Sequence, residues 1–258
     1  MHARRHLLQK DDSNYKMLVA YDGTDYGGWQ IQPNAKTIQE VLQNAVQTIT
    51  RHPVTVIGSG RTDAGVHATG QTANFTTPGE LDLYRFLGSL NALLPHSIRI
   101  LHIEKTESEF HSQYCAKGKI YHYHLWLDRV QDPFKRLYSY HVREKIDKGF
   151  LLEAARKFVG THDFSAFANE AHRGVAAYDA IRTIVRVDVV PQEGGVRIEY
   201  EADGFLYKMV RNITGTLLEV AAGKRSLDDI ERIFDTKDRR EAGKTAPPHG
   251  LFLVKVLY

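Results

Sequence analysis

The chain has little of what would indicate a secreted, membrane-spanning or cysteine-rich protein. Its 258 residues include a single cysteine, Cys115, which excludes an internal disulfide and a metal site built from several cysteines. No apolar stretch approaches the length of about 20 residues that spans a bilayer. The basic N-terminal residues 1–10 contain no apolar core of the kind found in signal peptides, so we expect a cytoplasmic protein.

A large excess of charge of one sign is also missing. The formal net charge is +3 and the isoelectric point is near 8.8. This mild basicity permits binding to nucleic acid without requiring it, because a basic groove can lie within a nearly balanced total. The hydrophobic content of 42% is ordinary for a globular protein, and the length allows one large or two medium domains.

The most informative stretch is Gly58–Gly70, which reads GSGRTDAGVHATG. Residues 54–57 before it and 71–76 after it have the composition of strands, so we expect a loop held between two strands. Its glycines permit positive φ and close approach of another backbone or of a ligand. Such a loop can present Asp63 at the mouth of a cleft. The alternative is an aspartate that only shapes a turn by bonding to its own backbone.

The first half of the chain predicts a strand–helix–strand–strand–helix–strand order. Apolar residues recur at helical spacing after Thr37, and Thr37 with Glu40 matches a capping box. The expected strands are 15–22, 54–57, 71–77 and 97–105, and the expected helices are 37–50 and 81–94. This order is typical of a ferredoxin-like unit, with two helices against one face of an antiparallel sheet.

The second half predicts a similar order of elements. We expect strands at 119–127, 182–190, 196–202 and 251–257, with a connection at 191–195, and helices at 147–159, 205–222 and 227–234. We therefore predict an α+β fold of two ferredoxin-like (RRM-like) halves. The expected divisions are a flexible tail at 1–14, an N-terminal domain at 15–110 and a C-terminal domain at 111–258. If the two antiparallel sheets join side by side, a cleft forms between the halves.

Two further stretches carry candidate residues. In the strand at 119–127, alternation places Tyr121 and Tyr123 on one face and His122 and His124 on the other. Burial in the core explains Tyr123 best, whereas the ring of Tyr121 could also stack on an extruded base. The two histidines share a face, but no third ligand at suitable spacing is nearby, so we expect ordinary surface histidines and no metal.

In the second of these stretches, residues 204–215, Arg211 lies on an otherwise apolar helix and should have a carboxylate partner. Such a pair would keep the carboxylate ionised. Basic residues are spread through the second half of the chain, and we expect some of them to line a phosphate track. They are Lys117, Lys119, Arg129, Lys135, Arg136, Arg143, Lys145, Arg173, Arg239, Arg240 and Lys244.

Three separated motifs give the chain a resemblance to the TruA family of tRNA pseudouridine synthases. They are residues 60–68 (GRTDAGVHA), the stretch around Tyr121, and residues 209–215 (MVRNITG). The resemblance implies that Asp63 is the catalytic aspartate, that Tyr121 faces the active site, and that Arg211 enters the cleft and pairs with Asp63. It also implies that Arg61 fills the space left by a flipped base.

The same resemblance implies the reaction and the partners. It implies isomerisation of uridine to pseudouridine at positions 38, 39 and 40 of the tRNA anticodon stem-loop, with no cofactor or metal, by a homodimer. Two other classes stay open on the residues alone. One is a non-catalytic tandem RNA-binding module that stacks bases on sheet aromatics. The other is a metal-dependent hydrolase that uses Asp63, His67 and the strand histidines.

Overall fold

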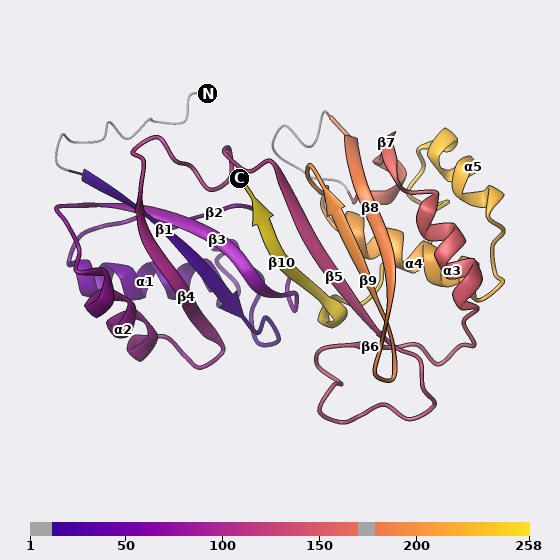
Figure 1. The fold of residues 1–258 in the computed structure, drawn as a ribbon, viewed down its shortest axis with the longest axis horizontal. Helices are drawn as coiled ribbons and strands as arrows, with labels where there is room; N and C mark the ends of the chain where they lie inside the picture. Colours follow the sequence, from indigo (N-terminus) through magenta and orange to yellow (C-terminus); the bar gives the residue numbers. More distant parts are fainter. Residues whose placement is uncertain (1–11, 170–178) are drawn as a thin grey trace. The chain divides into compact units, whose positions relative to one another are not determined.

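The computed structural model of the chain describes residues 12–169 and 179–258, which form two compact units (Figure 1). Unit 1 contains the described part of Met1–Ala64 together with Ala68–Ala116. Unit 2 contains Gly65–His67 and the described part of Lys117–Tyr258. We expected the division after residue 110. Residues 111–116 lie instead with unit 1, where the Ser112 hydroxyl donates to the Ile57 carbonyl at 2.6 Å.

The elements of unit 1 follow the predicted order. They are β1 (Asp12–Tyr21), α1 (Ile38–Thr50), β2 (Ile57–Gly58), β3 (His67–Pro78), α2 (Leu83–Leu93) and β4 (Ile98–Thr106). Strands β4, β1 and β3 are neighbours in that order, β2 pairs with β3, and these pairs are antiparallel. Both helices cover one face of this sheet (Figure 1), where Met17, Leu42, Phe75 and Leu90 are fully buried.

Strand β1 begins earlier than the sequence predicted. Residues 12–14, which we expected in the tail, are paired with β3, and the Asn14 side chain donates to the Glu107 and Phe110 carbonyls. The buried side-chain amide of Asn14 needs hydrogen-bond acceptors, and these two carbonyl groups supply them. The bonds hold this residue in the strand, so β1 extends further toward the N-terminus than predicted. The remainder of the expected tail, residues 1–11, lies outside the described residues.

The two helices of unit 1 confirm the sequence prediction within two or three residues. Thr37 caps α1, where its hydroxyl accepts from the Glu40 amide at 3.4 Å. Asp82 caps α2 in the same way, accepting from the Arg85 amide at 3.1 Å, and the helix ends just before Pro95. Satisfying free amides at the first turn fixes where each helix begins.

The elements of unit 2 also place helices against an antiparallel sheet. Its strands are β5 (Gly118–Trp126), β6 (Tyr140–His141), β7 (Gly160–Asp163), β8 (Ile181–Gln192), β9 (Gly195–Ala202) and β10 (Leu251–Leu257). Its helices are α3 (Lys148–Arg156), α4 (Met209–Ala221) and α5 (Asp228–Thr236), with single 3₁₀ turns η1 (Ser165–Phe167) and η3 (Pro248–Gly250). The strand order is β10-β5-β9-β8-β7, and β6 pairs with β5 in parallel. The mixed α+β class is confirmed.

Two expectations for unit 2 are wrong. Strand β8 continues past Pro191 to Gln192, and β9 begins at Gly195. Only Glu193 and Gly194 form the connection, and Gly194 takes φ +69° in this tight turn. Helix α4 begins at Met209 rather than at residue 205. Lys208 has left-handed backbone, with φ +61°, which separates the preceding residues from the helix. No helix in the described ranges is long and apolar enough to span a membrane.

Candidate functional site

The loop that carries Asp63 is shorter than the sequence suggested. We expected a loop over Gly58–Gly70, but β3 begins at His67, because Ala68 already pairs with Tyr21 of β1. The strand expected at 54–57 is reduced to Ile57–Gly58. The loop therefore consists of residues 59–66, which we call the Asp63 loop.

Thr62 anchors the Asp63 loop to the core of unit 1. Its hydroxyl shares a buried hydrogen bond of 2.8 Å with the Tyr21 hydroxyl, and its carbonyl accepts from the Trp29 amide at 3.0 Å. Burial raises the pKa of Tyr21 well above its usual value, only partly offset by hydrogen bonds with Thr62 and Gln71. Tyr21 therefore stays neutral and holds Thr62 at any physiological pH.

Trp29 and the glycines pack directly beneath the Asp63 loop. Trp29 is 2% exposed, so it is a core residue rather than an exposed aromatic. Gly28 has φ +91°, and a Cβ there would lie 2.5 Å from the Thr62 carbonyl oxygen. A Cβ on Gly58 would lie 2.5 Å from the Trp29 ring. Only glycine permits these approaches, so backbone packing sets the path of the loop.

The first residues of the loop are fixed by the Gln71 side chain. The buried Ser59 hydroxyl donates to the Gln71 side-chain oxygen at 2.6 Å, and the Gln71 amide donates to the Gly60 carbonyl at 3.0 Å. Along the loop, Arg61 is exposed, Thr62 is buried and Asp63 is half-buried. The backbone is thus held tightly while the Arg61 and Asp63 side chains lie on its accessible side.

The end of the Asp63 loop is held by residues of unit 2. Gly65 takes φ +76°, and a Cβ on it would lie 3.0 Å from the Pro248 ring. His67 is 1% exposed, and its Nε2 is 3.0 Å from the Leu137 carbonyl oxygen. Its ring stacks on Phe252 with a centroid separation of 4.6 Å. His67 thus has the contacts of a packed residue and not of a metal ligand.

Tyr121 and Tyr123 lie on the buried face of β5, as alternation predicted. The Tyr123 hydroxyl donates to the Pro247 carbonyl at 2.6 Å, and burial raises its pKa well above the usual value. The Tyr121 ring meets Phe205 edge to face, with centroids 5.2 Å apart. Phe205 precedes α4, so this contact links Tyr121 to the segment that leads into the helix carrying Arg211.

Arg211 lies in the first turn of α4 and is half-buried. Its Nε donates to the Ala246 carbonyl at 2.8 Å, and the Ala246 amide donates to the Arg211 carbonyl at 3.0 Å. The segment 242–247 reaches α4 this closely because Gly215 has no side chain. A Cβ there would lie 1.6 Å from the Lys244 carbonyl oxygen.

A buried network beside Arg211 was not found from the sequence. The amide of Asn212, which is fully buried, donates to the Phe167 carbonyl at 2.8 Å. Its oxygen accepts from Arg239 at 2.8 Å and from the Thr245 hydroxyl at 2.7 Å. Asn212 and Arg239 are 27 residues apart, so no local spacing pairs them. The network ties segment 242–247 to α4 and therefore supports the Ala246 carbonyl that holds Arg211.

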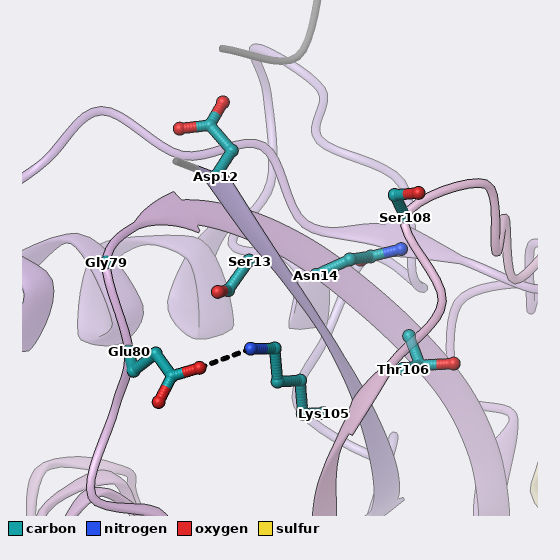
Figure 2. A pocket seen from close by; sticks show the side chains of 8 residues that line it. All are labelled: Asp12, Ser13, Asn14, Gly79, Glu80, Lys105, Thr106 and Ser108. Atoms are coloured by element: carbon teal, nitrogen blue, oxygen red, sulfur yellow. Dashed lines mark hydrogen bonds and ion pairs between the residues drawn. The ribbon is translucent and has the colours of Figure 1, made fainter. Parts of the chain in front are cut away.

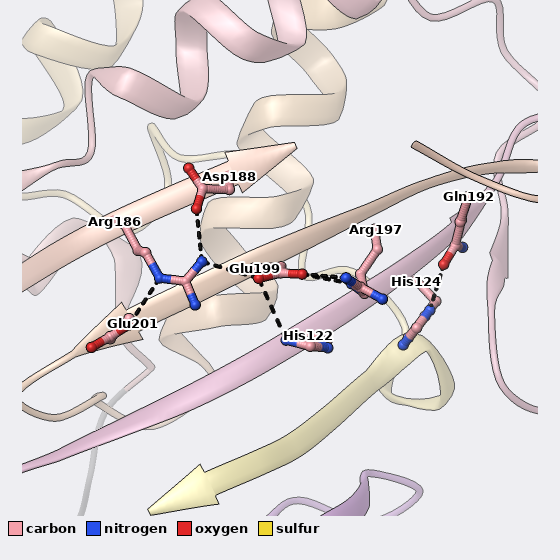
Figure 3. Close-up of polar contacts among 8 residues, drawn as sticks. All are labelled: His122, His124, Arg186, Asp188, Gln192, Arg197, Glu199 and Glu201. Carbon is pink, nitrogen blue, oxygen red and sulfur yellow. Dashed lines mark hydrogen bonds and ion pairs between the residues drawn. The ribbon is translucent and has the colours of Figure 1, made fainter. Parts of the chain in front are cut away.

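The histidines of β5 lie in a polar network on the opposite face of the strand (Figure 3). His122 is 3.8 Å from Glu199, which also binds Arg186 at 3.0 Å and Arg197. Burial lowers the pKa of His122 to about 4, which outweighs the raising effect of Glu199. His124 bonds to Gln192 at 2.9 Å. Within residues 12–169 and 179–258, no group of three or more His, Cys, Asp or Glu could hold a metal ion.

A cavity of about 540 Å³ lies in unit 1, lined by Asn14, Glu80, Lys105 and neighbouring residues (Figure 2). The ammonium group of Lys105 is 2.5 Å from the Glu80 carboxylate. The cavity lies at the start of β1, whereas Tyr21 contacts Thr62 at the end of the same strand. Seven residues of strand separate Asn14 from Tyr21, or about 23 Å. The cavity is therefore remote from the Asp63 loop.

The predicted site residues divide between the two units. Asp63 and Arg61 lie in unit 1, and Tyr121 and Arg211 lie in unit 2. Each belongs to a segment fixed by buried bonds or close glycine contacts. Of the basic residues expected to line a phosphate track, Arg173 lies outside the described residues.

Comparison with known proteins gives the chain close relatives over almost its whole length. A family model described as tRNA pseudouridine synthase matches residues 17–115 and 154–258. The chain is 56% identical to "tRNA pseudouridine synthase A 1" of Protochlamydia amoebophila, across 95% of this chain and 96% of that protein. It is 44% identical to "tRNA pseudouridine synthase A" of Acetivibrio thermocellus and of Lacticaseibacillus casei, each across 95% of this chain and nearly all of the relative.

A solved structure, the "Crystal Structure of a Cbf5-Nop10-Gar1 Complex", matches 79% of this chain and 54% of its own, with 13% identity and a TM-score of 0.34. A similarity this low supports no argument about fold or function.

Proposed function

The chain belongs to the tRNA pseudouridine synthase family, an isomerase family, and we propose that it converts uridine to pseudouridine at positions 38, 39 and 40 of the tRNA anticodon stem-loop. The observation that carries the proposal is the Asp63 loop. Its backbone is fixed by Thr62, Gln71 and Gly28, while the half-buried Asp63 lies in the segment by which the chain resembles the TruA synthases. A carboxylate on a rigid loop is preorganised for attack.

We assign Asp63 the role of nucleophile, acting either on the ribose C1′ or after a proton abstraction that yields a glycal. The reaction breaks the N-glycosidic bond, turns the uracil and rejoins it through C5. The C5 proton is lost and N1 regains a proton, so no redox partner is consumed. The base must first leave the stack, which costs a few kcal/mol.

The other three site residues act on Asp63 and on the base. We propose that Tyr121 stacks on the uracil and that its hydroxyl is the candidate base at C5. Arg211 orients Asp63, and its bond to the Ala246 carbonyl supports that role by fixing the guanidinium. Arg61 fills the space that the flipped base leaves, a role that its exposure allows.

The architecture of the units, the cellular location and the oligomeric state complete the proposal. The order β4-β1-β3-β2 in unit 1 supports our interpretation of that unit as a ferredoxin-like half, and we propose the same architecture for unit 2. We also propose a cytoplasmic homodimer in which one tRNA touches both subunits. The homodimer and the tRNA shared between its subunits rest on the resemblance described above.

The test is release of tritium from tRNA labelled at uridine C5, measured for the wild-type protein and for Asp63→Asn. We expect release from wild type and none from the variant, because the amide is not a nucleophile. Tritium release that survives in Asp63→Asn would remove Asp63 from the reaction. A wild-type protein that binds tRNA without release, and whose binding Asp63→Asn leaves unchanged, would be a non-catalytic RNA-binding module. Absence of tritium release together with a hydrolytic activity that is lost on chelation would instead indicate the metal-dependent hydrolase.

A further inference from the structure

The long connection between β5 and β6, whose path is drawn in Figure 1, carries an aromatic side chain and three cations that are exposed to solvent. We call residues 128–139 the β5–β6 loop. Phe134 at its tip is 82% exposed, and Arg129, Lys135 and Arg136 are exposed as well. A single exposed apolar side chain is common on a soluble protein, but here the Phe134 ring is grouped with Val130, which is 77% exposed, and with three cations in one loop.

The β5–β6 loop is held rigidly by its own hydrogen bonds. The Trp126 indole donates to the Val130 carbonyl at 2.8 Å, and the Gln131 amide donates to the Ser139 carbonyl at 3.0 Å. At the tip, the Asp132 carboxylate accepts from the Phe134 amide at 2.8 Å. Because these bonds already order the backbone, a ligand that contacts Phe134 does not have to order the loop.

The charges of the loop favour an anionic partner. The loop has three exposed cations against two carboxylates, Asp128 and Asp132, and the carboxylate of Asp132 accepts from the Phe134 amide within the turn. An exposed ring flanked by cations is the combination that binds unpaired nucleotides, since the ring stacks on a base and the cations contact phosphates.

The inner edge of the same loop contacts the end of the Asp63 loop. Leu137 supplies the carbonyl oxygen that lies 3.0 Å from Nε2 of His67, and the Tyr138 ring meets the His67 ring at 5.3 Å. Asp63 precedes His67 by four residues, so the covalent chain keeps the two Cα atoms within about 14 Å. An RNA with one nucleotide at Asp63 therefore has its neighbouring nucleotides within reach of this loop.

We propose that the β5–β6 loop is a second RNA-binding element of the protein, in which Phe134 stacks on an unpaired base and Lys135 and Arg136 contact phosphates. The proposal rests on the function proposed above. It concerns affinity for the substrate and leaves the chemical step to Asp63.

The test uses the full-length protein and tritium release from C5-labelled tRNA, with kcat and KM measured separately. We expect Phe134→Ala to raise KM about tenfold with little change in kcat. Phe134→Tyr should restore KM because it keeps the ring, and Phe134→Leu should not. We expect Lys135→Gln with Arg136→Gln to reduce the slope of log KM against log salt by about 1 to 2. The matched control is Tyr84→Ala with Arg85→Gln, an exposed aromatic and cation on α2, which should leave both constants unchanged.

Three results would overturn the proposal while leaving the enzyme function intact. The first is a KM of Phe134→Ala equal to that of the wild type. The second is a KM that Phe134→Leu restores as completely as Phe134→Tyr does. The third is a fall in the kcat of Phe134→Ala with unchanged KM. If Phe134→Ala changes the sedimentation coefficient of the protein while its KM at fixed subunit concentration equals that of the wild type, the loop is a contact between subunits instead. Absence of tritium release from the wild type would refute the proposed function itself. In that case, equilibrium tRNA binding by the same variants tests the loop, and an unchanged affinity would overturn its assignment.

Discussion

The buried bond between Tyr21 and Thr62 offers a quantitative test of how the Asp63 loop is held. The two hydroxyl groups are 2.8 Å apart and buried, so each satisfies the other. Thr62→Val removes the hydroxyl with little change in shape and leaves the phenol with one partner fewer. Loss of a buried hydrogen bond costs about 1–3 kcal/mol, and the Tyr21 hydroxyl keeps its bond with Gln71 in Thr62→Val, so we expect Thr62→Val and Tyr21→Phe each to destabilise unit 1 by about 1–2 kcal/mol.

The double variant should cost less than the sum of the single variants. Removing both hydroxyls leaves neither one unsatisfied, so we expect a coupling free energy of about 1 kcal/mol. Unfolding by urea can be followed with Trp29, which packs beneath the loop, in a Trp126→Phe background where it is the only tryptophan. Additivity within about 0.3 kcal/mol would refute the bond as the anchor of the loop.

The same cycle separates stability from catalysis. Thr62 is the residue before Asp63, and small displacements of a catalytic group are expensive, so we expect Thr62→Val to lower kcat about tenfold or more. The matched control is the bond of 2.8 Å between Tyr26 and Ser97 in the same unit. Tyr26→Phe should lower stability by a similar amount and leave kcat unchanged. Equal losses of kcat in the two variants would mean that general destabilisation explains the effect.

Three further predictions concern unit 2, and the second of them has a control in unit 1. Arg211→Ala should lower kcat at least about 100-fold with only a modest change in tRNA affinity, and an unaltered rate of tritium release would remove Arg211 from the site. Gly215→Ala should lower the unfolding free energy by about 2 kcal/mol or more, because its Cβ would meet the Lys244 carbonyl. Gly88→Ala, inside α2 with open space around it, should raise that energy by about 0.5–1 kcal/mol. The pKa of His122 is about 4 in the folded chain and near 6.5 in the unfolded chain. At a pH between these two pKa values, the unfolded state therefore binds more protons than the folded state. Stability should therefore fall as pH drops through this window, and His122→Gln should reduce the fall in urea midpoint between pH 7 and pH 5.

Local patterns were sufficient to predict the helices and most strands. Thr37 and Asp82 begin their helices because a side-chain oxygen satisfies amides of the first turn, and such bonds involve residues three apart. The shift in the start of α4 has a different cause. The apolar residues from Phe205 onward continue the helical pattern, but Lys208 takes a left-handed conformation, and the Phe205 ring packs against Tyr121 of a distant strand. Tertiary contacts of this kind override a periodic pattern.

The candidate site shows the same division between local and distant causes. The motif around Asp63 indicated a loop, yet the bond from Thr62 to Tyr21 and the packing of Gly28 against the loop backbone involve residues more than thirty positions apart. Asn212 was missed for this reason, and Arg239 was assigned to a phosphate track although its guanidinium donates to Asn212 and Thr245. Each is an ordinary polar residue in the sequence, and only the fold makes them buried partners. The sequence therefore indicated candidate site residues, but it did not indicate the distant partners that hold them in place.

Three residues around Asp63 each have a structural reason for their identity. Thr62 reaches inward to the Tyr21 hydroxyl, and Gly65 needs a positive φ where it meets Pro248. His67 fills a buried position between the Leu137 carbonyl and the Phe252 ring. The first of these anchors belongs to unit 1 and the others to unit 2. Asp63 and Ala64 are thus the only residues between the anchors of the two units. Because Thr62 is one residue from Asp63 and Gly65 is two residues from it, we expect a substitution at either anchor to shift the Asp63 backbone and to lower kcat.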